Sequence, residues 1–446
     1  MGITIVQKSD LTVRKKNPKI ALVLAGGAVT GGAFKLGGLK ALDDFLVNRK
    51  TTEFDTYVGL SAGAVLAAPL AAGVSPAEML KSLEGKSSQF GRFGPDVVYR
   101  PNLRDFVTRP AQFAFDVLTY LPGTVGDLLG QLPELAQRLR EPVAHTLQQP
   151  DVHNLQTVLA PIGEALTKRR GFPSPLDYLP SGLFDNSSIE HYLRSNFEKA
   201  DVPNDFREMY RATKKELYIG AMNLDTAERV VFGHDEDTSV TVSEAVQAST
   251  ALPGFYKPAR INGVDYVDGG VRRTANIDVA IEHGADLVIC YNPFRPFSNR
   301  VRRTKNGGYA VEGRPLAESG ILTVINQVFR TLLHSRLQYG LRQYQDDPNF
   351  RGDIVVIEPK ETDLRIFQLS AMAYWQRLRA GQYGYLSVTE SIQQNYDLIK
   401  QILETYGILM TRRQVRAGVE RLRDEDSEEA SKVLTDDVPR RNLRIA

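Results

Sequence analysis

The chain has 446 residues, of which 42% are hydrophobic and 24% are charged, and its formal net charge at pH 7 is +2. This composition is typical of a globular protein with a full hydrophobic core, and the small net charge argues against a dedicated nucleic-acid-binding protein. Cys290 is the sole cysteine, which excludes an intrachain disulfide.

The N-terminal segment bears on where the protein resides. Met1 to Lys19 is polar and basic and lacks the apolar stretch that a signal peptide needs. No later segment reaches the roughly 18 uninterrupted apolar residues of a membrane-spanning helix. We therefore expect a cytoplasmic protein, or one that binds peripherally to the inner membrane surface.

The first part of the chain predicts two consecutive strand–turn–helix units. The apolar run Ile20 to Ala25 ends at a glycine-rich turn, Gly26 to Gly32, and leucines at helical spacing follow it. The second unit has a strand at Phe54 to Val58, a sharp turn at Gly59 to Gly63 and a helix of small residues. Further short apolar runs predict strands at Glu216 to Ala221, Val230 to Phe232 and Ala285 to Tyr291. Strands that alternate with helices predict a three-layer α/β fold with a mainly parallel sheet.

The character of the sequence changes between about Glu84 and Pro180, where prolines recur. Because proline breaks longer helices, we expect a helical insertion made of short pieces. Its apolar stretch from Phe113 to Leu139 is a candidate lid or membrane-docking surface. Apolar helix faces packed on the core are an equally good interpretation.

The C-terminal part predicts a helical extension. Arg300 to Gly308 is basic and indicates a solvated loop, whereas Leu316 to Tyr344 and Ile366 to Tyr406 have helical patterns with a strand, Asp353 to Glu358, between them. Arg412 to Ala446 is highly charged and predicts a frayed helix followed by a disordered tail. The expected domains are thus a catalytic domain over 19–300 with its insertion at about 84–180, a mostly helical extension over 301–411 and a tail over 412–446. The extension is also a candidate surface for homo-oligomerisation.

A Gly-x-Ser-x-Gly pentapeptide, Gly59-Leu60-Ser61-Ala62-Gly63, lies at the second predicted strand-to-helix junction. A tight turn there raises the serine hydroxyl above the sheet, as a nucleophile requires. Gly59 and Gly63 are needed because a side chain at either position would collide with the turn. The alternative is a plain turn that happens to contain a serine.

The glycine-rich turn can supply the hydrogen-bond donors that stabilise an oxyanion. The candidate donors are the backbone N–H groups of Gly26, Gly27, Ala28, Gly31 and Gly32, which lie beside a helix N-terminus. Phosphate binding is the main alternative, but Ala28 stands where G-x-G-x-x-G needs glycine and no Gly-Lys-Ser/Thr follows. A purely structural turn is the other alternative.

Asp268 lies in an Asp-Gly-Gly sequence at the end of a predicted hairpin. Asn262-Gly263 between apolar residues is a strong signal for a two-residue hairpin turn. The second strand of this hairpin delivers Asp268 to a glycine turn. Taken alone, Asp-Gly-Gly is a common loop sequence.

In this order, the three motifs resemble those of the patatin-like phospholipases of the bacterial type. Two further segments match the family: Gly-Leu-Phe-Asp at 182–185, and Ala-Ser-Thr-Ala-Leu-Pro-Gly-Phe at 248–255. The similarity extends over roughly Lys19 to Tyr291. It implies a patatin-like sandwich fold.

The resemblance also implies a mechanism. Ser61 would attack a lipid ester with Asp268 as its base, and water would hydrolyse the acyl-enzyme. The expected activity is of the phospholipase A type on glycerophospholipids or another lipid ester, at a transient membrane surface and without a cofactor or metal. The sequence departs from the family at Ala28, where many members have a third glycine, and near Thr30, where many have a basic residue that braces the loop.

Two alternatives to a Ser–Asp dyad remain open. His283 follows Asp268, as the histidine of a Ser-His-Asp carboxylesterase would, but Ala280 to Gly284 is typical of a helix end, where histidine needs no catalytic role. A non-catalytic relative that binds only lipid or protein is the other alternative. The spacing of His, Cys, Asp and Glu suggests neither a zinc nor a calcium site.

Overall fold

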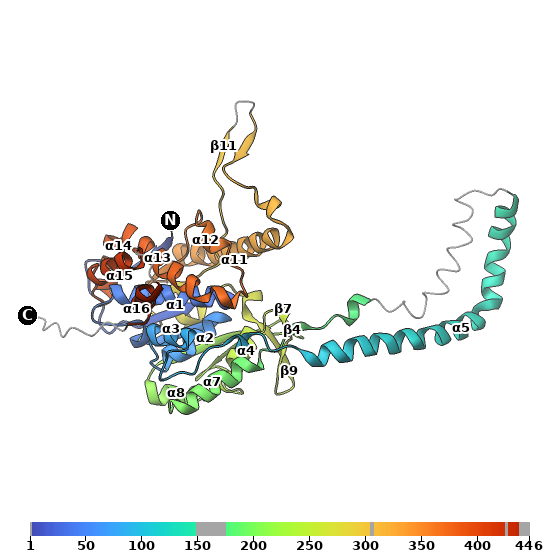
Figure 1. Ribbon diagram of the computed structural model, residues 1–446, viewed down its shortest axis with the longest axis horizontal. Coiled ribbons are helices and arrows are strands. Elements are labelled where there is room, and N and C mark those ends of the chain that lie inside the picture. Colours follow the sequence, from blue (N-terminus) through green and yellow to red (C-terminus); the bar gives the residue numbers. More distant parts are fainter. Residues whose placement is uncertain (1, 149–174, 304–306, 424–426, 437–446) are drawn as a thin grey trace, which may run out of the picture. The chain divides into compact units, whose positions relative to one another are not determined.

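The computed structural model describes residues 2–148, 175–303, 307–423 and 427–436 (Figure 1). These residues form two compact units. The first comprises Met1–Arg100 and Phe184–Ala446, and the second comprises Pro101–Leu183.

Nine strands of the described residues form the central sheet of the first unit, in the order β1-β13-β10-β2-β3-β5-β9-β8, with β6 also paired to β5. The strands from β13 to β5 run parallel, and β1, β6, β8 and β9 pair antiparallel around them. Their bounds are β1 (Ile3–Gln7), β2 (Ile20–Leu24), β3 (Thr56–Leu60), β5 (Glu216–Asn223), β6 (Arg229–Gly233), β8 (Ala259–Ile261), β9 (Val264–Asp268), β10 (Leu287–Tyr291) and β13 (Asp353–Ile357). This sheet confirms the predicted α/β class.

Both faces of the sheet are covered, which explains why its central strands are continuous apolar runs. Alternate residues of β2 point into two cores: Ile20, Leu22 and Leu24 into one, Ala21 and Val23 into the other. Helices on the first face are α1 (Ala28–Phe45), α2 (Ala62–Ala71), α3 (Pro76–Glu84), α7 (Ser187–Lys199), α8 (Phe206–Thr213), α9 (Val242–Thr250) and α13 (Arg377–Gln394). Helices α10 (Ile277–Glu282) and α11 (Ile321–Asp346) contribute to the second core. The three-layer arrangement is therefore confirmed.

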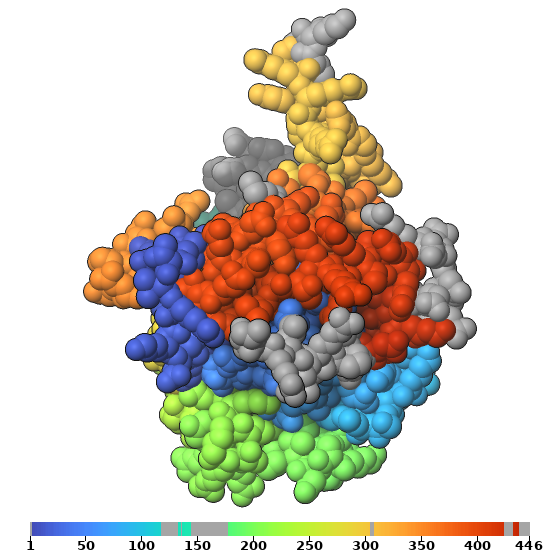
Figure 2. Space-filling view, turned by 90° about the vertical axis from the view of Figure 1, so that its left-hand side faces the viewer, coloured from blue at the N-terminus to red at the C-terminus, as the bar shows by residue number. Residues whose placement is uncertain are grey.

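The C-terminal helical extension packs onto the N-terminal helices of the same unit, as Figure 2 shows for the orange-to-red segments over the blue ones. A Cβ atom at Gly37 of α1 would lie 1.8 Å from the carbonyl oxygen of Gly381, and one at Gly384 would lie 1.8 Å from that of Phe34. Helices α1 and α13 are thus in backbone contact. The remaining short elements there are α12 (Leu364–Phe367), α14 (Tyr396–Thr405) and the 3-10 turns at Leu316–Ser319 and Tyr374–Gln376.

The charged C-terminal segment differs from its prediction. Helix α15 (Arg413–Arg423) lies where a frayed helix was expected, but α16 (Ser427–Thr435) replaces the first part of the predicted disordered tail. The side chains of Val415, Val433 and Leu434 are buried. A narrow apolar stripe is enough to dock each helix, and the surrounding charges hide that stripe in the composition. Residues 424–426 and 437–446 of the predicted tail lie outside the described residues.

The predicted loop at Arg300 to Gly308 also differs, because its flanks pair as strands β11 (Val301–Arg303) and β12 (Tyr309–Val311). This hairpin extends away from the other elements of its unit (Figures 1 and 2). Other short elements of the first unit are α4 (Pro95–Val98), β7 (Gly254–Tyr256) and the 3-10 turns at Thr51–Glu53 and Gly269–Val271. Among the described residues, no helix is long and apolar enough to cross a membrane.

The second unit contains one 46-residue helix, α5 (Leu103–Gln148), so the expectation of short pieces is wrong. The helix continues through Pro110, Pro122, Pro133 and Pro142. Each proline removes one backbone hydrogen bond and kinks the helix without ending it when the residues around it are good helix formers, and Figure 1 shows α5 bending along its length. A 3-10 turn at Pro175–Tyr178 and strand β4 (Gly182–Phe184) follow, whereas residues 149–174 of the predicted insertion lie outside the described residues.

Candidate active site

Ser61 occupies a strained turn between β3 and α2, with φ of 53° and ψ of −128°. Such a conformation costs free energy in a non-glycine residue and is concentrated at functional sites. The flanking glycines permit it: a Cβ atom at Gly63 would lie 2.0 Å from the Leu24 carbonyl oxygen, and one at Gly59 would lie 2.5 Å from the Ala64 Cα atom. The turn therefore has the geometry of a nucleophile elbow.

A second serine fixes this turn from behind. The backbone N–H of Ser61 donates to the Ser249 hydroxyl (2.8 Å), which in turn donates to the Gly220 carbonyl oxygen (2.6 Å). Ser249 lies on α9 and Gly220 on β5. The sequence indicated Ser249 only as part of the motif at 248–255. Its hydrogen bond to the Ser61 turn was not predicted.

Asp268 ends strand β9, whose hairpin with β8 turns at Asn262 and Gly263, with φ of 50° and 84°. The predicted hairpin is thus confirmed. Antiparallel pairing with β5 places Asp268 opposite Ala221. The Asp268 carboxylate accepts a hydrogen bond from the Gly270 N–H (2.8 Å). The hairpin delivers this carboxylate to the cleft that Ser61 also lines.

The surroundings of Asp268 make its ionised form costly. The residue is only 3% exposed. Burial raises the pKa of its carboxyl group to about 6, against the opposing effects of the Ser61 and Gly270 hydrogen bonds and of the Lys35 cation. A carboxylate with a raised pKa is a stronger base than a solvated one.

The glycine-rich turn approaches Ser61 closely. A Cβ atom at Gly26 would lie 3.3 Å from the Ser61 Cβ atom. Helix α1 begins at Ala28 (φ 52°) after Gly27 (φ 148°). Gly26, Gly27 and Ala28 therefore lie at the serine, beside the positive end of a helix dipole.

The other two predicted donors do not have this arrangement. The Gly31 N–H donates to the Gly27 carbonyl oxygen (2.9 Å) within the first turn of α1. Gly32 lies inside the helix, where the amide bonds to the carbonyl four residues earlier, and its missing side chain allows close approach to Ala62. The sequence predicted that Gly31 and Gly32 also donate to the oxyanion. This is corrected, because both amides are engaged in the hydrogen bonds of helix α1.

Lys35 is the charged residue that sequence reasoning missed. Its side chain is fully buried in α1, and its Nζ atom donates to the carbonyl oxygens of Ala25 and of Gly26, the latter at 2.9 Å. Burial lowers the pKa of Lys35 to about 7, although nearby Asp268 and Cys290 favour the charged form. The chain lacks the basic residue that many family members have near Thr30. Lys35 instead holds the glycine-rich turn through the carbonyl groups of Ala25 and Gly26. The available signal was a lysine within an otherwise apolar helix face.

His283 lies near the N-terminal ends of the parallel strands, whereas Ser61 lies at their C-terminal ends. The Nζ atom of Lys19, just before β2, donates to the His283 carbonyl oxygen (2.6 Å) and to Glu216 at the start of β5 (2.6 Å). Ser61 follows the other end of the parallel five-residue strand β3, which is about 16 Å long. His283 ends α10, as predicted, and its Nδ1 atom lies 2.8 Å from the Val279 carbonyl oxygen.

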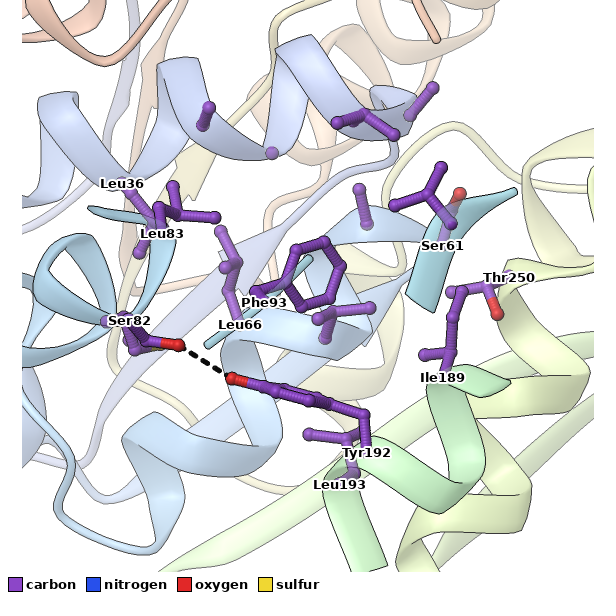
Figure 3. Close-up of a pocket in the computed structure, with 18 of the residues that line it drawn as sticks. Leu36, Ser61, Leu66, Ser82, Leu83, Phe93, Ile189, Tyr192, Leu193 and Thr250 are labelled. Atoms are coloured by element: carbon purple, nitrogen blue, oxygen red, sulfur yellow. Dashed lines mark hydrogen bonds between the residues drawn. The ribbon is translucent and has the colours of Figure 1, made fainter. Parts of the chain in front are cut away.

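Ser61 lies between two hollows of the first unit. On one side is an apolar cavity of about 100 Å³, lined by residues from α1, α2, α3 and α7 (Figure 3). On the other side is an open cleft of about 1090 Å³ that also contains Asp268, Gly27 and Ala28. Aromatic and aliphatic side chains line much of this cleft, among them Phe255, Phe294, Phe297, Leu322, Ile325 and Phe329. Ser61 therefore borders both an apolar cavity and a larger cleft.

The chain is similar to a protein family and to several known proteins. The model of the patatin-like phospholipase family matches residues 22–281. A probable lipid hydrolase, 463L, of Invertebrate iridescent virus 6 is 25% identical over 104 residues, which cover 23% of this chain and 36% of the viral protein.

Solved structures with a similar arrangement include VipD from Legionella pneumophila, with 15% identity, a TM-score of 0.36 and coverage of 97% of this chain and 82% of that one. Another is human GIVD cytosolic phospholipase A2 in complex with methyl gamma-linolenyl fluorophosphonate. It has 10% identity, a TM-score of 0.28 and coverage of 89% of this chain and 60% of that one.

Proposed function

Since the chain belongs to the patatin-like phospholipase family, we propose that it is a lipid acyl hydrolase of the phospholipase A type. Its substrates are the carboxylic esters of glycerophospholipids, and its catalytic groups are Ser61 and Asp268. The observation that carries this proposal is the strained strand-to-helix turn that places Ser61 in the same cleft as the buried Asp268 carboxylate.

The reaction proceeds in two steps through an acyl-enzyme. Asp268 accepts the Ser61 hydroxyl proton while the serine oxygen attacks the ester carbonyl carbon. The carbon–oxygen bond to the glycerol then breaks, and the proton passes from Asp268 to the departing lysolipid oxygen. In the second step Asp268 accepts a proton from water, the hydroxide attacks the acyl carbonyl, and the fatty acid leaves as Ser61 regains its proton.

The oxyanion formed in each step needs donors close to Ser61. We assign this role to the backbone N–H groups of Gly27 and Ala28 at the start of α1. Their position beside Ser61 and the positive end of the helix dipole support the assignment. Gly26 contributes by its lack of a side chain, which lets the loop approach the serine.

A phospholipid substrate requires access to a membrane surface. The N-terminal part of α11 borders the open cleft and exposes an apolar face formed by Ile321, Leu322, Ile325, Val328 and Leu332. The neighbouring hairpin carries exposed arginines at 300, 302 and 303, which favour anionic headgroups. These features support transient docking of this face on a membrane surface, consistent with a cytoplasmic protein that binds membranes peripherally.

The test is fatty-acid release from mixed phospholipid vesicles by folded variants. We expect Ser61→Ala and Asp268→Asn to lose activity by a factor of about a thousand or more, because each removes a group that acts in both steps. Asp265→Asn, on the same hairpin but paired with Arg260, is the matched control and keeps its activity.

The alternatives predict different outcomes in the same assay. Loss of activity in His283→Ala, with the fold intact, would establish a Ser-His-Asp esterase and contradict the dyad. Vesicle binding by wild type without any ester hydrolysis would identify a non-catalytic lipid-binding relative.

A further inference from the structure

One arginine of the open cleft has no carboxylate partner among the residues that the structure describes. Arg330 of α11 lines this cleft together with Ser61 and Asp268. The groups that accept its hydrogen bonds are all neutral. Burial lowers the pKa of Arg330 to about 10, and no carboxylate of the described residues opposes this effect. Because arginine nevertheless stays charged at neutral pH, the cleft contains an uncompensated cation.

The guanidinium group of Arg330 is held in a fixed orientation. Its Nε atom donates to the Asn326 side-chain oxygen, one turn earlier in α11 (3.1 Å). Its Nη1 atom donates to the carbonyl oxygens of Pro293 (2.9 Å) and Arg295 (3.3 Å). The central carbon of the group lies 5.6 Å from the centroid of the Phe367 ring. These contacts orient the planar group before any ligand binds, which lowers the entropic cost of binding.

The remaining nitrogen of this group is available to a ligand. Within the described parts of the chain, Nη2 of Arg330 has no hydrogen-bond acceptor. It is also not one of the fully buried polar atoms that lack a partner there. Because Arg330 lines the cleft, we infer that the two Nη2 N–H groups are accessible from it. Such donors on a fixed guanidinium group suit the oxygen atoms of a phosphate.

Pro293 connects the Arg330 side chain to the glycine-rich turn. Its carbonyl oxygen accepts the Nη1 hydrogen bond, and its ring packs against the turn. A Cβ atom at Gly27 would lie 2.9 Å from the Pro293 Cγ atom, and one at Gly31 would lie 3.6 Å from it. A single residue therefore separates the Arg330 cation from the loop that we assign to the oxyanion. In a glycerophospholipid, only the glycerol backbone separates the ester carbonyls from the phosphate, so this spacing suits such a molecule.

The other charges of the cleft also favour an anion. Arg300 and Arg314 line it in addition to Arg330, whereas its acidic lining residues are Asp268 and Glu312. Positive charges thus outnumber negative ones along the cleft. A ligand that carries a negative charge gains from this balance, and a neutral ligand does not.

We propose that Arg330 is a phosphate-binding residue that selects glycerophospholipids over neutral acylglycerols. Its Nη2 N–H groups donate to a phosphate oxygen of the substrate whose ester carbonyl lies at Ser61. This inference rests on the proposed function and adds the residue that recognises the headgroup. Arg330 lies outside residues 22–281, which match the family model. The selectivity is therefore a property of the C-terminal extension and not of the motifs that place Ser61 and Asp268.

The test compares kcat/KM for two dissolved, monomeric substrates, dihexanoyl phosphatidic acid and dihexanoylglycerol. We expect wild type to prefer the phosphorylated ester by about tenfold or more, because charge-assisted hydrogen bonds form only with that ester. Arg330→Gln should lose most of this preference through a higher KM. Arg330→Lys keeps the charge without the planar group and should retain part of it.

The matched control is Arg336→Gln on the same helix. Arg336 also donates to a backbone carbonyl oxygen, that of Val271 (2.7 Å), but it does not line the cleft. This variant should keep the wild-type preference. Equal loss of activity on both esters in Arg330→Gln would mean that Arg330 only supports the segment at 293–295, and would overturn the proposal.

A second readout does not depend on hydrolysis. Titration calorimetry of Ser61→Ala with dihexanoyl phosphatidic acid should show binding that weakens about tenfold or more when Arg330→Gln is added. Inorganic phosphate that binds Ser61→Ala as tightly as this lipid would assign the site to a free anion and overturn headgroup recognition. If wild type hydrolyses neither ester but binding still depends on Arg330, the proposed function fails and the phosphate site stands. Hydrolysis of both esters with equal kcat/KM removes only the phosphate site.

Discussion

The Asp268 carboxyl group sets the pH dependence expected of the site. It acts as a base only when it is ionised, and burial raises its pKa to about 6. We therefore expect kcat/KM to fall about tenfold per pH unit below that pH. A pH profile of ester hydrolysis, with stability checked by circular dichroism at each pH, measures the acid limb. An acid limb near the ordinary aspartate pKa would contradict the role of Asp268.

Lys35 modulates the same carboxyl group. Its cation lowers the pKa of Asp268, so Lys35→Met should shift the acid limb to higher pH. The same variant should reduce kcat, because the carbonyl groups of Ala25 and Gly26 lose the donor that fixes the oxyanion loop.

The matched control for Lys35 is Lys40→Met on the same helix. Lys40 is also buried, but its partner is Asp44, at 2.7 Å. Removal of Lys40 should lower stability without moving the acid limb. An equal shift in both variants would mean that Lys35 acts only through the stability of α1.

At the scale of elements, the hydroxyl of Ser249 joins the nucleophile turn to helix α9 and strand β5. Ser249→Ala leaves the Ser61 N–H and the Gly220 carbonyl without this partner in a buried setting. We expect a loss of about 1–3 kcal/mol in the free energy of unfolding and a fall in kcat larger than the change in KM. Urea denaturation and steady-state kinetics measure the two effects, and Ser249→Thr, which retains a hydroxyl, tests rescue. Wild-type kcat in a destabilised Ser249→Ala would show a purely structural role.

The elements of the first unit were largely predictable because local patterns determine them. Buried parallel strands such as β2 and β10 are continuous apolar runs, and the turn at Asn262 requires residues that tolerate positive φ. The antiparallel edge strand β1 was not predicted, because Ile3–Gln7 alternates only weakly and its pairing partner is more than 300 residues away along the chain.

The predictions for α5 and α16 were wrong because they relied on residue composition and not on tertiary contacts. Prolines in α5 suggested helix ends, yet the helix continues through them. The charges of α16 concealed the buried Val433. At the site, motifs predicted Ser61 and Asp268, and the fold places both in one cleft. The contact of Ser249 with Ser61 joins residues 188 positions apart, which no local pattern reveals.

At the scale of the whole molecule, two candidate membrane-docking surfaces can be distinguished. The sequence pointed to Phe113 and Phe115 of α5. The Phe113 ring packs against the Tyr178 ring, with centroids 5.2 Å apart, and the Phe115 side chain is 65% exposed. The structure adds the apolar face of α11, where Ile321 and Val328 are 69% and 53% exposed and lie next to residues that line the open cleft at Ser61.

We expect Ile321→Glu with Val328→Glu to weaken binding to vesicles containing anionic phospholipid by about tenfold or more, because two apolar anchors become charged. Hydrolysis of a soluble short-chain ester should change little, since neither side chain lines the cleft. Leu398→Glu with Leu409→Glu, which alters two exposed leucines elsewhere, is the matched control, and Phe113→Ser with Phe115→Ser tests the α5 surface. Vesicle sedimentation measures binding, and analytical ultracentrifugation measures self-association. A dimer that dissociates in the α11 variant while vesicle binding persists would assign this face to a second copy of the chain and overturn its role in membrane docking.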